Sequence, residues 1–191
     1  VAVYSLAAQA EMPLGERPAP RRIWFVVDRR IVVDEAFRRA EAIAEKLQKA
    51  ADGPLKTIAD RLRRLSGFKD SAPPLAVGRL RGGVIRDDGW ARVPSLPAIL
   101  TSTVDQVGSR LLFRGYGFSD SLAPIHAGLA GNDSLIILDE AHCAKPFLQT
   151  LSAIRDLRSP RWAKDPIPLP FQFSVMSATL SQDGGGNRKR F

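Results

Sequence analysis

The sequence predicts an α/β domain in which a mostly parallel sheet is covered on both faces by helices. First, strand-like apolar runs alternate with helical segments along the 191 residues. Second, the apolar runs are short and unbroken, which is typical of strands buried on both faces of a parallel sheet. Third, each predicted strand runs into a polar cluster, and open α/β sheets bind ligands at the carboxyl ends of their strands.

The first half of the chain is predicted to combine helices with two strands. Asp34 suits an N-cap, and Gly67 suits the end of a helix. The predicted elements are a helix over 1–10, a loop over 12–20, a strand over 22–27, a helix over 35–51, a helix over 55–66 and a strand within 73–80.

The second half follows a polar, turn-rich segment over 84–97, which we interpret as a small hairpin or surface insertion. Leu112 and Leu157 complete apolar helical stripes, so we expect both to face the core. The predicted elements are a strand over 98–102, a helix opening at 103–106, a loop over 114–118, a helix over 122–129, a strand over 135–138, a helix over 147–157 and a strand over 171–176. The basic tail over 181–191 is expected to be flexible.

The stretch over 135–143, which reads LIILDEAHC, carries the strongest chemical signal. Four apolar residues lead directly into Asp139 and Glu140. At the end of a buried strand, such a pair suits nucleotide hydrolysis, in which the Asp holds Mg²⁺ and the Glu orients or deprotonates the attacking water. For the two carboxylates alone, a strand that simply ends in a polar turn is the better interpretation. The full apolar run and the following His142 favour the catalytic one.

Five polar clusters follow predicted strands, and a parallel sheet gathers them at one edge. These clusters are Asp28–Arg30, Arg81–Gly83, Ser102–Gln106, Asp139–His142 and Ser177–Thr179.

The charge balance favours a polyanionic partner. The chain has a formal net charge of +8, with 18 basic and 12 acidic residues in 1–92 against 10 and 8 in 93–191. A basic surface suits nucleic acid, although an arginine-rich solvated surface gives the same count. Cys143 is the only cysteine, which excludes an internal disulfide and indicates a reducing, cytoplasmic location. No segment is apolar enough to cross a membrane, so we expect no membrane partner.

The acidic motif and the downstream Ser177-Ala178-Thr179 resemble motifs II and III of superfamily 2 DEAH-type helicases. The remaining clusters follow the order of motifs Ia and Ib in their first RecA-like domain. Within that superfamily, the segments 25–37, 102–117 and 137–151 resemble the CRISPR-associated helicase–nuclease of type I CRISPR interference. The resemblance implies a three-layer α/β/α RecA-like P-loop NTPase domain over 1–180.

The resemblance also implies roles for five residues of motifs II and III. Asp139 would hold Mg²⁺ and, with Glu140 and His142, would face bound ATP. Glu140 would activate the water. His142 would couple the nucleotide site to Ser177 and Thr179 through hydrogen bonds. Without the DEAH partner, Ser177 and Thr179 would be plain strand-end caps.

Six further residues would contact the backbone of single-stranded DNA, because helicases of this class hold phosphates rather than read bases. An ion pair with Asp34 or Glu35 is an equally good interpretation for one of the two arginines. The six residues are Arg29, Arg30, Gly82, Gly83, Thr103 and Gln106.

The sequence departs from the family in lacking G-x-x-x-x-G-K-[ST]. We therefore expect a fragment, truncated before the helix over 1–10, that also lacks the second RecA-like domain and the nuclease domain. By itself it is expected to be inactive. The expected function is part of an ATP-dependent DNA helicase motor recruited by a CRISPR surveillance complex. The alternatives are another superfamily 2 translocase or RNA helicase, or a non-catalytic nucleic-acid-binding remnant.

Overall fold

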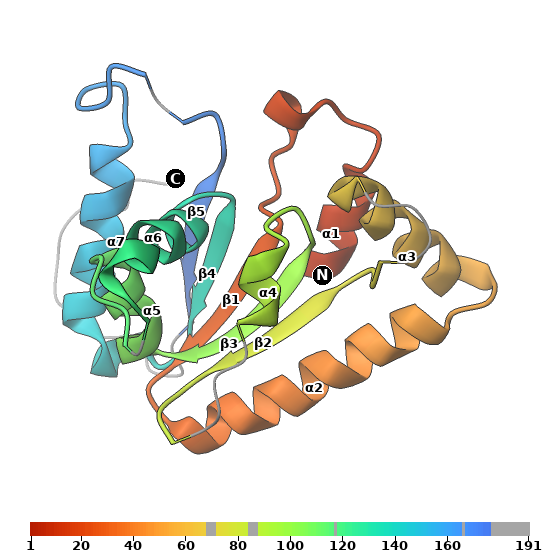
Figure 1. Ribbon diagram of the computed structural model, residues 1–191, viewed down its shortest axis with the longest axis horizontal. Coiled ribbons are helices and arrows are strands. Elements are labelled where there is room, and N and C mark those ends of the chain that lie inside the picture. Colours follow the sequence, from red (N-terminus) through yellow and green to blue (C-terminus); the bar gives the residue numbers. More distant parts are fainter. Residues whose placement is uncertain (68–71, 84–87, 117, 166, 177–191) are drawn as a thin grey trace, which may run out of the picture.

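A computed structural model confirms the α/β prediction (Figure 1). It describes residues 1–67, 72–83, 88–116, 118–165 and 167–176. Five parallel strands form one sheet in the order β2-β3-β1-β4-β5. The strands are β1 (Arg22–Val27), β2 (Ala76–Leu80), β3 (Ala98–Thr103), β4 (Ser134–Leu138) and β5 (Phe171–Val175).

Helices lie on both faces of the sheet, which gives the three-layer α/β/α arrangement of a RecA-like domain. One face carries α4 (Gly89–Arg92), α5 (Val104–Leu111), α6 (Ala123–Gly131) and α7 (Lys145–Leu157) (Figure 1). The other carries α2 (Arg30–Lys49), against which α3 (Gly53–Ser66) packs, and α1 (Ala2–Ala8) packs on α3. Short 3-10 turns lie at Leu14–Glu16, Asp120–Leu122 and Ala141–Cys143. Within the described ranges, no helix combines the length and the apolar character needed to cross a bilayer.

The main core lies between the sheet and helices α4–α7. Strand residues alternate, so that Trp24 and Val26 of β1 and Ile136 and Leu138 of β4 point into this core and are fully buried. A second cluster joins the three helices of the opposite side through residues such as Leu62 of α3. Of the strands that the structure describes, only β3 reaches this second cluster, through Ile99.

The face beneath α2 is less completely covered. A hollow of about 390 Å³ lies between α2 and strands β1 and β3, and we call it the α2 hollow. Its walls are mostly apolar and include Phe25, Ala36, Ile43 and Ile99, and Asp139 is among its few polar lining residues. The central carboxylate of the predicted site therefore borders open space rather than packed core.

Several sequence predictions about the helices are wrong. Asp34 is not an N-cap, because α2 begins at Arg30 and takes Arg29 as its cap residue. Segment 84–97 is no hairpin in its described part, which contains the single helical turn α4. Leu112 and Leu157 are 57% and 59% exposed, because each lies at the end of its helix where the apolar stripe leaves the sheet. The tail over 181–191 lies outside the described residues.

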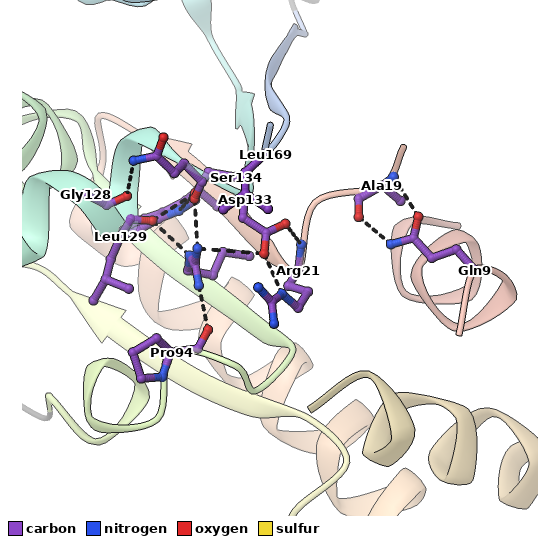
Figure 2. Close-up of polar contacts among 12 residues, drawn as sticks. Gln9, Ala19, Arg21, Pro94, Gly128, Leu129, Asp133, Ser134 and Leu169 are labelled. Atoms are coloured by element: carbon purple, nitrogen blue, oxygen red, sulfur yellow. Dashed lines mark hydrogen bonds and ion pairs between the residues drawn. The ribbon is translucent and has the colours of Figure 1, made fainter. Parts of the chain in front are cut away.

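A buried polar cluster holds the amino end of the sheet together (Figure 2). The Arg22 guanidinium donates to the carbonyl oxygens of Pro94, Leu129 and Asn132 at 2.8–2.9 Å. Asp133 accepts hydrogen bonds from the backbone N–H and the guanidinium of Arg21 and pairs with Arg22 at 3.9 Å. Burial lowers the pKa of Arg22 to about 10, against the opposing attraction of Asp133. This cluster ties β1 to the segments that precede β3 and β4.

Candidate functional site

The first part of the candidate site lies at the carboxyl end of β4. The Asp139 N–H donates to the Val26 carbonyl at 2.9 Å, which places Asp139 beside the end of β1. One carboxylate oxygen of Asp139 accepts the N–H of Glu140 at 2.9 Å. The other oxygen has no hydrogen-bond partner among the described residues, and Asp139 is one of the residues that line the α2 hollow.

Glu140 has an unusual backbone and a cationic neighbour. Its φ of 51° and ψ of 41° lie in the left-handed region, which costs a non-glycine residue about 1–2 kcal/mol. The Arg29 Nε lies 3.6 Å from a Glu140 carboxylate oxygen, and the two side chains are 70% and 35% exposed. Strained backbone of this kind concentrates at functional sites, so the turn after β4 is a sound candidate for one.

The residues present fit part of a magnesium nucleotide site. Mg²⁺ is commonly held by one or two protein carboxylates together with waters and substrate phosphates. Asp139 supplies one such carboxylate with a free oxygen, and Glu140 follows it directly. Within the described residues, no group of three or more His, Cys, Asp or Glu side chains is placed to hold a metal by itself. A Mg²⁺ ion held by Asp139 would therefore take its remaining ligands from waters and substrate phosphates.

Of the three residues predicted to couple the nucleotide site to strand movement, the structure describes only His142. His142 lies exposed on the 3-10 turn that follows Glu140. The Ala141 N–H faces the Met176 carbonyl at 3.5 Å, and the Met176 N–H donates to Leu138 at 2.8 Å. These contacts bring the His142 turn to the end of β5. Ser177 and Thr179 lie outside the described residues.

The second part of the candidate site lies where β1, β2 and β3 end. Four of the six predicted nucleic-acid-binding residues line one hollow of about 380 Å³, namely Arg30, Gly82, Thr103 and Gln106. We call it the edge hollow. They come from the start of α2, the turn after β2, the last position of β3 and the first turn of α5. The parallel strand order brings them together, as the sequence predicted.

The remaining two predicted residues lie elsewhere. Arg29 forms an ion pair with Glu140, and not with Asp34 or Glu35 as the sequence suggested. Gly83 is exposed beside the edge hollow, and its φ of +81° is readily adopted only by glycine. A Cβ added to Gly82 would meet the Arg30 guanidinium at 3.3 Å, so the Arg30 side chain lies against this glycine.

Asp34 holds the end of β2 and the residue before Gly82 against α2. Its carboxylate accepts hydrogen bonds from Arg81 at 2.7 Å and Arg79 at 3.1 Å. The hydrogen bond from Arg81 is the main reason that the pKa of Asp34 lies below its usual range. Because Asp34 is in α2 and Arg81 precedes Gly82, this pair joins the helix to the glycine turn.

Three residues of the edge hollow had no predicted role. Asp28 and Asp105 belong to the polar clusters after β1 and β3, and Tyr116 lies in the loop after α5. The strand-end position was already a signal for the two carboxylates. For Tyr116 the available signal was an aromatic residue between two glycines, which is typical of an exposed loop tip.

The fold and site together define an α/β domain of the RecA-like layer arrangement with polar residues gathered at one sheet edge. Comparison of the chain with family models, curated proteins and solved structures found no match.

Proposed function

We propose that this chain is part of the motor of an ATP-dependent DNA helicase that acts on single-stranded DNA. The observation that carries the proposal is the arrangement of one sheet edge. The Asp139–Glu140 pair and the edge hollow both lie at the carboxyl ends of the strands, joined by the consecutive residues Arg29 and Arg30. A motor needs a nucleotide site and a strand-binding site in this kind of proximity.

On this proposal, Asp139 holds the magnesium–nucleotide complex through its free carboxylate oxygen. Bound Mg²⁺ would neutralise charge on the phosphates of ATP. Glu140 orients the attacking water, and its left-handed backbone sets the direction of its side chain. His142 lies on the next turn, beside the end of β5, where it suits the predicted coupling to Ser177 and Thr179.

The edge hollow would hold the strand. Arg30, the Thr103 hydroxyl and the backbone around Gly82 are suited to phosphate oxygens. Such contacts position a strand without reading its sequence. The overall charge of +8 favours association with a polyanion.

The biological setting is proposed from the resemblance of segments 25–37, 102–117 and 137–151 to the type I CRISPR helicase–nuclease. On this proposal, a cytoplasmic surveillance complex bound to target DNA recruits the motor. Its test is co-sedimentation of the chain with a type I surveillance complex on target DNA. Co-sedimentation that is equally strong with a control protein of the same charge would contradict the assignment.

A non-catalytic nucleic-acid-binding domain is the second candidate. The sequence contains the residues of the edge hollow but no G-x-x-x-x-G-K-[ST] loop to hold phosphates of ATP. On this alternative, the chain binds a nucleic-acid strand but does not hydrolyse ATP, so Glu140 has no catalytic role.

Glu140→Gln separates the two candidates. In the complete motor, with a phosphate loop present, the variant should bind ATP normally but lose turnover, since glutamine cannot accept the proton of water. Turnover would be measured as DNA-stimulated phosphate release. A variant that hydrolyses ATP as fast as the parent would remove Glu140 from the proposed role.

Strand binding is tested in the 191-residue chain by fluorescence anisotropy with a labelled single-stranded oligonucleotide. Arg30→Ala should weaken binding and lower the slope of log affinity against log salt by about 0.7, the value for one lost phosphate contact. Arg38→Ala is the matched control, because Arg38 is an exposed arginine of the same helix outside the edge hollow. Equal effects of both variants would contradict a specific role for Arg30.

A further inference from the structure

We propose that the edge hollow binds an unpaired nucleobase, with a preference for bases that carry an exocyclic amino group. The inference rests on the proposed binding of a single strand and adds a recognition element to it. It concerns what occupies the hollow: a base, with the phosphates held at its rim.

Beside the groups that suit phosphate, the lining of the hollow carries two carboxylates, which a phosphate does not explain. Arg30 is its one cation among the described residues, whereas Asp28 and Asp105 are both carboxylates. Neither carboxylate has an ion pair or a side-chain hydrogen bond within the described part of the chain, so each remains available as an acceptor. Carboxylates repel phosphate but accept hydrogen bonds from base amino groups, as Asp and Glu do from cytosine.

Gln106 adds a hydrogen-bond donor of fixed orientation. Its side-chain oxygen accepts from Arg110 Nη1 at 2.9 Å, and the Gln106 backbone carbonyl accepts from the same nitrogen at 2.8 Å. Because a guanidinium can only donate, the amide oxygen must face Arg110, which is 1% exposed. The Gln106 NH₂ group is then left for an acceptor on a ligand, such as a base carbonyl or ring nitrogen.

Tyr116 supplies an aromatic surface at the same hollow. Its side chain lines the edge hollow and the residue is 57% exposed. The loop is anchored nearby, since the Phe118 ring covers Gly115 and stacks on the buried His126 ring at 4.2 Å between centroids. An exposed aromatic ring on an anchored loop is the usual platform on which proteins stack unpaired bases.

The chemistry of the hollow specifies a single strand. In a duplex, each exocyclic amino group has one hydrogen engaged in pairing, and the base faces are covered by their neighbours, so no base face is available to Tyr116. Cytosine and adenine offer an amino donor, whereas the corresponding group of thymine is a carbonyl acceptor. We therefore expect the chain to bind oligo-dC and oligo-dA more tightly than oligo-dT of equal length.

The test compares the affinities of labelled oligo-dC and oligo-dT for the 191-residue chain at one salt concentration. The parent should bind oligo-dC about tenfold more tightly. Asp28→Asn and Asp105→Asn exchange an acceptor for a group that can also donate, so each should lower the dC-to-dT affinity ratio. The ratio is the informative quantity, because loss of a negative charge by itself strengthens binding to every strand equally.

Tyr116→Ala should weaken binding of either strand about 5- to 150-fold, the range for one stacked base. Tyr116→Phe should retain affinity, and an abasic oligonucleotide should bind the parent and the alanine variant equally. Phe113→Ala is the control, because Phe113 is an exposed aromatic of the same loop outside the hollow.

The outcomes separate the two levels of inference. Binding of all strands with equal affinity, and a dC-to-dT ratio unchanged by both aspartate variants, would overturn base recognition while leaving strand binding intact. If none of the oligonucleotides bound to the chain, both the proposed function and the base pocket would be overturned.

Discussion

Replacement of Asp133 by asparagine should destabilise the domain strongly, although Asp133 lies far from the candidate site. The Asp133 and Arg22 side chains are only 4% and 6% exposed, and Asp133 also accepts two hydrogen bonds from Arg21. Asparagine tolerates the left-handed backbone of this position, where φ is 51°, so the variant removes the charge without adding backbone strain.

The size of the effect follows from the partners that remain. Breaking a buried pair by removal of one charge costs about 3–5 kcal/mol. Arg22 keeps its three carbonyl acceptors, and the oxygen of the introduced amide would still accept one hydrogen bond, so the loss should fall below that range, at about 2–3 kcal/mol. With a urea m value of about 2 kcal/mol/M, the midpoint of unfolding should drop by about 1 M.

The assay is urea unfolding followed by tryptophan fluorescence, because Trp24 is completely buried beside the cluster and becomes exposed on unfolding. Asp156→Asn is the matched control. It breaks an Arg155–Asp156 pair whose side chains are 54% and 67% exposed, and such a pair contributes little. A midpoint shift for Asp133→Asn no larger than that of Asp156→Asn would refute the reasoning from burial.

Two further predictions concern the edge of the sheet. Asp34→Asn should destabilise the domain by about 1 kcal/mol at neutral pH, because it weakens the contacts with Arg81 and Arg79. Since the folded pKa of Asp34 is lowered, its contribution is present above the ordinary aspartate pKa and is lost as the pH falls through the folded value. The difference in urea midpoint between parent and variant should therefore shrink in acid; a difference independent of pH would contradict this. Gly83→Ala should cost about 1 kcal/mol or more, because its φ of +81° strains alanine; Gly15→Ala, at an open position of ordinary φ, is the control for the same measurement.

The sequence was sufficient for the sheet because its central strands are apolar on both faces. Phe25 and Ile136 lie in runs that only a buried strand explains, and the pairing order then places the polar clusters at one edge. Helix boundaries were less predictable. The segment after Arg30 contains three β-branched residues, which disfavour helix locally, but burial of Val33 and packing of α2 on the sheet override that preference.

The candidate site was predictable in its location but not in its contacts. The sequence correctly predicted that Arg30 and Gln106 lie close together, because the carboxyl ends of parallel strands meet at one edge of the sheet. The direction of each side chain depends on local backbone geometry that a sequence pattern does not carry. Tyr116 was missed for the same reason: a loop has no periodicity from which its exposed face can be deduced.

The position of Arg29 shows why a predicted strand contact and an observed ion pair are compatible. Successive residues at the start of a helix diverge by about 100°, so Arg29 and Arg30 can face different partners. The Arg29–Glu140 pair spans 3.6 Å between largely exposed groups, and such pairs contribute about 0–1 kcal/mol. A phosphate forms a stronger, charge-assisted hydrogen bond with a guanidinium. The contact with Glu140 is therefore too weak to prevent Arg29 from binding a phosphate of DNA. The DNA contact of Arg29 stays a prediction, and it is compatible with the ion pair to Glu140.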